Sequence, residues 1–201
     1  MGAAERKSQH LDKGHGLFFW ESLRSLSVTA SICPSSRFLA AALLRPVDFS
    51  TARVVVDLGA GTGAITHAIL RRMRPDAVLY ALDVNPAFIS HLEEKIHDSR
   101  VVPILGGAER LGEYLGRHGV RKADAVISSL GLSAMGPDLR AAIAGQVAAH
   151  LAEGGVMTQY QYIRGIGGFD ERDFLQRYFR QVALERVILN LPPANVFTCR
   201  L

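Results

Sequence analysis

The sequence predicts an α/β domain in which helices cover both faces of a mainly parallel sheet. Short apolar runs rich in β-branched residues alternate with segments of helical periodicity over most of the 201 residues. One such run, beginning at Val54, passes directly into a glycine-rich turn and then into a helical segment. The last two apolar runs, 186–190 and 195–199, are separated only by Leu191–Ala194, so we expect an antiparallel pair to close this doubly wound sheet.

The chain divides into an N-terminal arm, residues 1–32, and the sheet domain, residues 33–201. Apolar residues of the arm fall on one face of a predicted helix and include Phe18, Phe19, Trp20 and Leu23. This amphipathic helix could lie on a membrane surface, or it could pack on the domain core or against a second copy of the chain. Periodicity alone favours packing.

Local signals place the elements of the sheet domain. Pro34 ends the arm, and Ser35 or Ser36 can cap a helix over 37–44. Asn85 and Pro86 start the helix that follows the second strand. Further helices are predicted at 64–73, 87–97, 110–116, 137–151 and 169–181, and further strands at 78–83, 101–105, 123–129 and 156–162.

The turn after the first strand has the pattern of a nucleotide-binding site. It reads Asp57-Leu58-Gly59-Ala60-Gly61-Thr62-Gly63, and its glycines let the backbone approach a ligand closely. Asp83 ends the second strand 20 residues after Gly63, where a carboxylate can accept hydrogen bonds from both hydroxyls of a ribose. The alternative is a glycine turn that only connects two elements.

Asp57 narrows the choice of ligand. A carboxylate immediately before the glycines would repel a pyrophosphate, so a dinucleotide fits poorly. It suits a ligand that carries positive charge at this point, such as an amino-acid ammonium or a sulfonium.

Composition excludes several classes of protein. The two cysteines, Cys33 and Cys199, are far apart and match no metal-binding spacing, and the seven histidines are scattered, so we expect free thiols and no metal. No apolar run approaches the roughly 20 residues of a membrane span, and no secretory signal is evident, which predicts a cytoplasmic protein. The net charge of +4 favours anionic partners, either lipid headgroups or nucleic acid.

From about Leu17 onward the chain resembles the bacterial phospholipid N-methyltransferases, which convert phosphatidylethanolamine stepwise to phosphatidylcholine and are related to ribosomal RNA adenine dimethylases. Three places carry the resemblance: the aromatic N-terminal helix with Pro34-Ser35-Ser36-Arg37, the glycine motif with Asp83-Val84-Asn85-Pro86-Ala87-Phe88, and Asn190-Leu191-Pro192-Pro193-Ala194 with the short strand ending at Cys199-Arg200. The resemblance implies a Rossmann-like fold and the cofactor S-adenosylmethionine (SAM).

The resemblance also implies roles in cofactor binding. Asp57 and the backbone of Gly59, Ala60, Gly61, Thr62 and Gly63 would hold the methionine end of SAM. Asp83 would bind the ribose, Val84 and the adjoining Asn85 would lie at the adenine, and Pro34, Ser35 and Ser36 would close over the cofactor. Gly107, Ala108 and Glu109 would lie at the adenine edge. Because the family usually has an aspartate where Gly107 stands, the contact to the adenine amino group would shift to the backbone or to Glu109.

On the substrate side, the loop from Ser128 to Leu132 would face the methyl group and the incoming amine. Ser128 and Ser129 would orient the amine, and Tyr160 or Tyr162 would accept its proton or hold the lipid phosphate, the alternative for both tyrosines being ordinary strand packing. Leu130 and Gly131 would contact the substrate. The family usually has a proline in place of Gly131, and this loop offers no aromatic ring on which a base could stack, so we expect no nucleic-acid substrate.

The leading hypothesis is therefore a phospholipid N-methyltransferase. It would be cytoplasmic and peripherally bound to the inner face of the cell membrane, with the helix of Phe18, Phe19, Trp20 and Leu23 lying on an anionic lipid surface. A methyltransferase for a soluble amine or an rRNA adenine is the first alternative. A non-catalytic SAM-binding protein, suggested by Gly107 and Gly131, is the second.

Overall fold

The computed structural model describes residues 35–163 and 170–201. The predicted N-terminal helix with Phe18, Phe19, Trp20 and Leu23, and also Pro34, lies outside the described residues. The proposed division between the arm and the domain at residue 32 therefore stays a prediction.

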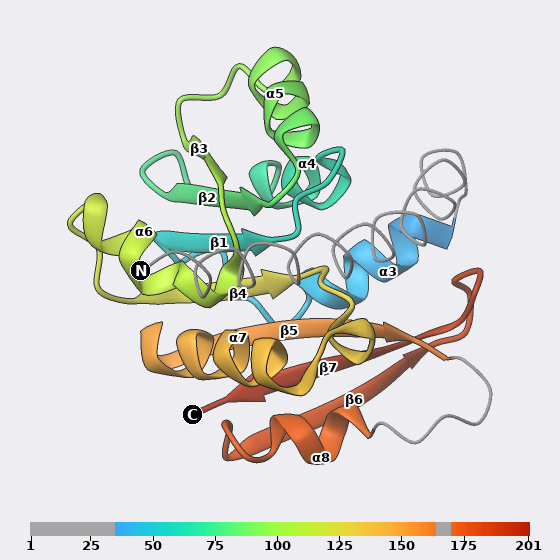
Figure 1. The fold of residues 1–201 in the computed structure, drawn as a ribbon. Coiled ribbons are helices and arrows are strands. Elements are labelled where there is room, and N and C mark those ends of the chain that lie inside the picture. The colour runs from blue at the N-terminus through green and yellow to red at the C-terminus, as the bar shows by residue number, and fades with distance from the viewer. Residues whose placement is uncertain (1–34, 164–169) are drawn as a thin grey trace, which may run out of the picture.

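The described residues form one seven-stranded sheet with helices on both faces (Figure 1). Its order is β3-β2-β1-β4-β5-β7-β6. Neighbours from β3 to β5 pair in parallel, whereas β7 is antiparallel to both β5 and β6. The strands are β1 Val54–Leu58, β2 Val78–Asp83, β3 Val101–Leu105, β4 Ala123–Ser128, β5 Leu151–Tyr162, β6 Gln181–Val187 and β7 Ala194–Arg200. The predicted doubly wound α/β fold with an antiparallel end is confirmed.

Each face of the sheet buries its own hydrophobic core. Helices α3 (Ser35–Leu44), α4 (Ala64–Leu70) and α5 (Pro86–Lys95) cover one face. Helices α6 (Leu111–Arg117), α7 (Pro137–His150) and α8 (Glu171–Leu175) cover the other. Two short 3₁₀ turns, η1 Ala108–Arg110 and η2 Leu132–Ala134, follow β3 and β4.

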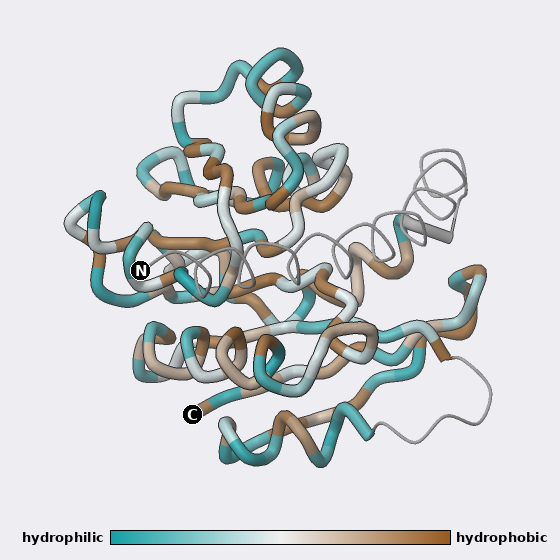
Figure 2. Tube along the Cα trace, viewed as in Figure 1, coloured by the Kyte–Doolittle hydropathy of each residue, from teal (hydrophilic) through white to brown (hydrophobic). Residues whose placement is uncertain are grey.

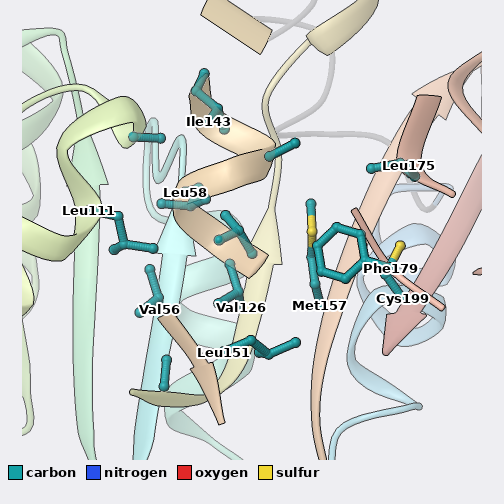
Figure 3. Close-up of a cluster of buried hydrophobic side chains, with 14 of the residues drawn as sticks. Val56, Leu58, Leu111, Val126, Ile143, Leu151, Met157, Leu175, Phe179 and Cys199 are labelled. Atoms are coloured by element: carbon teal, nitrogen blue, oxygen red, sulfur yellow. The ribbon is translucent and has the colours of Figure 1, made fainter. Parts of the chain in front are cut away.

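The core under α6, α7 and α8 is continuous from the middle of the sheet to its antiparallel end. Figure 3 shows Val56 and Val126 of the central strands next to Leu111 and Ile143 from the covering helices, and Met157 beside Phe179 towards the antiparallel end. Burial of the apolar side chains on both faces of β1 and β4 explains why these strands are almost uniformly hydrophobic in sequence.

The second half of the chain departs from the predicted element boundaries. The helix predicted at 169–181 is only α8, which begins after Asp170, whose side chain accepts hydrogen bonds from the first backbone N–H groups. Strand β6 begins at Gln181 and not at residue 186. The sequence does not predict its first residues, because the exposed residues at its centre hide the alternation that is typical of a strand. Residues 188–190, predicted as strand, form a turn.

Smaller corrections apply elsewhere. Helix α3 begins at Ser35, two residues before the predicted start, and α4 ends at Leu70 and not at residue 73. Strand β5 begins at Leu151, and the predicted turn at 153–155 lies within it, where the pairing with β4 shifts register.

The carboxyl ends of the parallel strands meet at one edge of the sheet. Leu58 of β1 pairs with Leu82 of β2 and with Ser128 of β4, which pairs in turn with Gln159 of β5. The glycine turn, Asp83 and the loop after β4 therefore lie side by side along this edge. Ligands of open α/β sheets bind at this edge.

Candidate functional site

The glycine turn after β1 requires its glycines. Gly59, Gly61 and Gly63 have positive φ angles of 79°, 53° and 84°, which disfavour any residue with a side chain. A Cβ on Gly59 would lie 3.0 Å from Leu130 Cδ2, and one on Gly63 would lie 2.8 Å from Leu92 Cδ2. The turn therefore packs tightly between the loop after β4 and helix α5.

Asp83 joins two turns at the end of β2. Its carboxylate accepts hydrogen bonds from the backbone N–H groups of Gly61 and Asn85, each at 2.9 Å. Burial raises the pKa of Asp83 although both bonds lower it. Because a carboxylate has about four acceptor positions, Asp83 retains capacity for ribose hydroxyls. Asn85 serves as the cap of α5, since its Oδ1 accepts the N–H of Ala87.

Asp57 is the second buried carboxylate of the pocket. It is fully buried at the end of β1, and its Oδ2 accepts a hydrogen bond of 2.7 Å from the hydroxyl of Thr66 in α4. Its Oδ1 has no hydrogen-bond partner. Burial raises its pKa to about 7, against the effect of Thr66 and with a smaller contribution from Asp83. A buried carboxylate oxygen without a partner fits a ligand that brings positive charge.

The region where the adenine is expected is apolar and exposed. Val84 and Leu105, at the ends of β2 and β3, are 52% and 54% exposed. Glu109 lies over Gly107, with its carboxylate in the space that a Cβ on Gly107 would need. This placement supports the prediction that Glu109 substitutes for a side chain at position 107. Ala108 is buried in the core, so its methyl group does not face the pocket.

The loop after β4 contains the predicted substrate residues. Ser128 is fully buried, and its Oγ accepts a hydrogen bond from the N–H of Leu130 at 3.4 Å. Ser129 donates its N–H to Leu58 O at 2.8 Å, while its buried hydroxyl has no partner. Ser129 is therefore the better placed of the two serines to orient an amine. Gly131 precedes the turn η2, whose Leu132 is buried in the core.

Sequence reasoning missed two buried polar residues behind this loop. Gln159 Nε2 donates to the carbonyl oxygens of Leu130 and Tyr160 at 2.7 and 2.8 Å, and its Oε1 has no partner. Glu171 is 2% exposed, and neither carboxylate oxygen has a hydrogen bond of normal geometry. Burial raises the pKa of Glu171 to about 8, opposed by the nearby Gln159 amide.

Helical spacing could have indicated Glu171. It lies three and four residues before Phe174 and Leu175, and so on the buried face of α8. Thr66 and Leu105 were not predicted as site residues either, because no pattern in the sequence around them indicates such a role.

Tyr160 lies on the other face of the sheet from Ser128. Its side chain packs with the core under α3, where its ring centroid is 5.2 Å from that of Tyr162. Burial raises the pKa of its hydroxyl well above the ordinary value, which makes it a poorer proton acceptor at neutral pH. The structure does not bring Tyr160 together with Ser128, and its catalytic role stays a prediction.

Ser35 and Ser36 form the start of α3. Among the described residues, no helix combines the length and the apolar character needed to cross a bilayer. The part of the chain that the structure describes also holds no group of three or more His, Cys, Asp or Glu side chains able to bind a metal ion.

Comparison with known sequences identifies the family. A family model described as a methyltransferase domain matches residues 56–157. An ornithine lipid N-methyltransferase of Singulisphaera acidiphila is 31% identical over 185 residues, which are 92% of this chain and 94% of that protein. A ribosomal RNA small subunit methyltransferase H of Christiangramia forsetii is 33% identical over 87 residues, which are 43% of this chain and 28% of that protein.

Solved structures share the fold at low sequence identity. A 1,6-didemethyltoxoflavin-N1-methyltransferase of Burkholderia thailandensis, determined with S-adenosylhomocysteine, superposes with a TM-score of 0.70 at 20% identity, covering 100% of this chain and 91% of that one. The N-methyltransferase NodS of Bradyrhizobium japonicum gives 0.67 at 15% identity, covering 84% of this chain and 97% of that one.

The pocket and the comparisons agree on the cofactor. The buried oxygen of Asp57 without a partner fits the positive end of SAM, and the exposed Val84 and Leu105 fit its adenine. The chain therefore belongs to the SAM-dependent methyltransferases, in the family that includes a bacterial lipid N-methyltransferase, and S-adenosylmethionine is its cofactor.

Proposed function

We propose that this protein methylates the amino group of a phospholipid headgroup and carries phosphatidylethanolamine towards phosphatidylcholine. The observation that carries the proposal is the similarity to a lipid N-methyltransferase over 94% of that protein. Similarity of this extent includes β4 to β7, where the substrate is expected, as well as the cofactor pocket. The likeness to the RNA methyltransferase spans only 43% of this chain.

The described residues suit a reaction that depends mainly on alignment. SAM supplies a methyl group that its positively charged sulfur already activates. Asp57 and the glycine turn would hold the charged end of the cofactor, and Asp83 would hold its ribose. The hydroxyl of Ser129, buried without a partner, would orient the attacking amine.

The amine must lose its proton before it can attack. Glu171 is the better matched acceptor, because its pKa of about 8 is nearer to neutral pH than that of Tyr160, which burial raises further from an already higher value. Gln159 connects Glu171 to the loop after β4, since its side chain lies near Glu171 and donates a hydrogen bond to the carbonyl oxygen of Leu130.

An ornithine lipid is the second candidate substrate. The relative from Singulisphaera acidiphila, an ornithine lipid N-methyltransferase, favours it, because 31% identity over most of both chains is compatible with a shared substrate. Both candidates present an amine on a lipid headgroup, so both require the protein to work at a membrane. We propose that it is a cytoplasmic protein bound peripherally to the inner face of the cell membrane, where the net charge of +4 suits anionic lipid.

Methyl-labelled SAM with defined vesicles tests the proposal. The vesicles contain phosphatidylethanolamine, ornithine lipid or neither, and thin-layer chromatography separates the labelled products. We expect label in the mono- and dimethylated forms of phosphatidylethanolamine, and much less label with Asp57→Asn when SAM is not saturating. Label in ornithine lipid alone would replace the first substrate by the second.

Two further outcomes would overturn the proposal. Label in ribosomal RNA or in a soluble amine, with none in either lipid, would assign the chain to another substrate class. Calorimetric binding of SAM without turnover on any of these substrates would support a non-catalytic SAM-binding protein.

A further inference from the structure

The turn between β6 and β7 exposes three aliphatic side chains. Ile188, Leu189 and Leu191 are 75%, 69% and 79% exposed, which are the three highest values among the large hydrophobic side chains of the described residues. Figure 2 shows hydrophobic colour at this tip, which extends to the right of the sheet in the same view as Figure 1. We call residues 188–193 the hairpin tip.

The hairpin tip reverses the usual burial pattern of a turn: its polar residue is buried and its apolar residues are exposed. Turns usually expose Asn, Asp or Gly and bury their apolar residues. Here Asn190 is 4% exposed, and its Nδ2 donates a hydrogen bond of 2.7 Å to the carbonyl oxygen of Pro192. The buried Asn190 side chain thus stabilises the turn by a hydrogen bond to its backbone, while the aliphatic side chains on either side of it are exposed to solvent.

The base of the hairpin is held firmly. Val187 and Ala194, which pair across it, are buried in the core that contains Leu39 and Leu43 of α3. The N–H of Ile163, just after β5, donates to Pro193 O at 2.8 Å. The tip therefore projects from a rigid support at the carboxyl end of β5, the edge that also carries the loop after β4.

Basic residues flank this end of the molecule. Arg186 precedes the tip and is exposed, and Arg37 is exposed in the first turns of α3 with its guanidinium 4.9 Å from the ring centroid of Phe38. Glu185 is paired with Arg45, so it does not cancel the charge of the other two arginines. Exposed aliphatic side chains that follow an exposed arginine match a surface that has anionic headgroups above an apolar interior.

We propose that the hairpin tip inserts Ile188, Leu189 and Leu191 into an anionic lipid surface. A protein partner fits less well, because three side chains on a narrow tip offer far less than the roughly 800 Å² that each partner buries in a standard interface. This proposal extends the proposed function and rests on it, because a lipid substrate is the reason for the enzyme to bind a membrane. It assigns the contact to a segment distinct from the N-terminal helix.

Vesicle flotation with the full chain tests the hairpin tip. The vesicles are phosphatidylcholine with or without phosphatidylglycerol, and SAM is left out. The double variant Leu189→Ser/Leu191→Ser should bind anionic vesicles at least about tenfold more weakly, because each buried CH₂ contributes about 0.8 kcal/mol. Leu201→Ser is the matched control, since Leu201 is 44% exposed and follows the other end of β7. It should bind as the wild type does.

A conservative variant separates hydrophobicity from shape. Leu189→Met/Leu191→Met keeps apolar side chains at both positions and should retain vesicle binding. Unchanged vesicle binding by the serine double variant would overturn the proposal. So would a wild-type dimer in sedimentation that the serine variant dissociates without loss of vesicle binding, because the tip would then be a contact between copies of the chain.

Lipid methylation in detergent micelles distinguishes this proposal from the proposed function. The serine double variant should methylate lipid in micelles at the wild-type rate and lose rate only on vesicles. Equal loss in micelles and on vesicles would overturn the hairpin proposal by showing damage to the active site. If neither protein methylates any lipid and the binding difference is still found, the proposed function fails and the hairpin proposal stands.

Discussion

The two halves of the sheet differ in how completely their polar groups are satisfied. The N-terminal half comprises β1 to β3 and their loops. There Asp83 accepts hydrogen bonds from two backbone N–H groups, and Asp57 accepts one from the hydroxyl of Thr66. In the C-terminal half, β4 to β7, buried polar atoms lack partners; they belong to Ser129, Thr158, Gln159, Glu171 and Asn195. Among the described residues of the N-terminal half, Asp57 Oδ1 is the only buried side-chain polar atom without a hydrogen-bond partner.

The buried polar groups of the N-terminal half are thus almost fully hydrogen-bonded, whereas several of those in the C-terminal half are not. Buried polar groups without partners are costly, and proteins retain them mainly where a ligand or a reaction uses them. The N-terminal half has one such atom, at the point where the cationic cofactor is expected. The C-terminal half has several around the loop after β4, where an amine and its headgroup would supply the missing partners.

The largest expected effect tests the rigidity of the N-terminal half. Gly63→Val places a β-branched side chain at a φ of 84°, with its Cβ 2.8 Å from Leu92 Cδ2. We expect a loss of about 3 kcal/mol in the free energy of unfolding, because backbone strain and the clash add. Urea denaturation measures it.

Gly116→Ala is the matched control for Gly63→Val. Gly116 lies in α6, and a Cβ there would meet nothing within 4 Å. That variant should gain about 0.5 to 1 kcal/mol from the lower entropy of its unfolded chain. Equal stability of both variants would show that the glycine turn is adaptable and would remove the contrast between the halves.

The next effect concerns the one unsatisfied carboxylate of the N-terminal half. Asp57→Asn removes the charge facing the cofactor, so SAM should bind roughly 10- to 100-fold more weakly, as for loss of a charged hydrogen bond. Isothermal titration at pH 8 measures the affinity. Thr66→Val is the comparison, since it keeps the charge, deletes the hydrogen bond to Asp57 and should weaken binding less.

Asp57 also predicts how stability depends on pH. Its pKa in the folded protein is raised to about 7 from an ordinary 3.8, so the folded state holds the proton more tightly than the unfolded state. Its contribution to stability is therefore complete below about pH 4 and is lost as the pH rises through 7. Without SAM, Asp57→Asn should be more stable than the wild type at pH 8 and similar at pH 4. A wild type that gains more stability than the variant between these pH values would contradict the assignment.

The N-terminal half was predictable because its function needs particular residue types at short, fixed spacings. The turn from Gly59 to Gly63 requires positive φ angles, and Asp83 must end the neighbouring strand, so both leave a local pattern. The bounds of β2 and β3 were predicted correctly for a related reason, since both strands are apolar runs with polar flanks.

The C-terminal half was less predictable because its key contacts join segments that have no common local pattern. Glu171 and Gln159 approach each other only after α8 and β5 have packed. Ile188 and Leu189 were assigned to a strand because they are aliphatic, and hydropathy does not distinguish an exposed tip from a buried strand. The exposed central residues of β6 obscured its alternation, so the strand was predicted only from residue 186.

The third effect tests the unsatisfied carboxylate of the C-terminal half. The folded-state pKa of Glu171 is raised to about 8 from an ordinary 4.5, so its contribution to stability falls as the pH rises through 8. Glu171→Gln should therefore exceed the wild type by about 1 to 2 kcal/mol in the free energy of unfolding at pH 9, and match it near pH 4. The rate of methylation by Glu171→Gln should fall most at and above pH 8, where Glu171 of the wild type is ionised and can accept a proton. A variant with unchanged rate at every pH would leave Glu171 as a structural residue only.

The smallest effect compares an arginine within the N-terminal half with one that links α3 to the C-terminal half. Arg100 is 22% exposed, pairs with Asp98, whose pKa it lowers to about 2, and donates to the carbonyl oxygens of Leu70, Met73 and Arg74. Arg100→Ala should cost about 1 to 2 kcal/mol in the free energy of unfolding, because it removes one donor from each of those carbonyl oxygens.

Arg45, which joins the end of α3 to β6, should matter much less. Among the described residues, its side chain is hydrogen-bonded to Glu185, and the two side chains are 66% and 44% exposed, so water and salt screen the pair. Arg45→Ala should cost no more than about 0.5 kcal/mol, and 0.5 M salt should remove even that difference. A loss as large as that of Arg100→Ala would mean that α3 is held to the C-terminal half by charge. The support of the hairpin tip would then depend on ionic strength, whereas a small loss leaves that support to the buried packing of Leu39 and Leu43 against Val187 and Ala194.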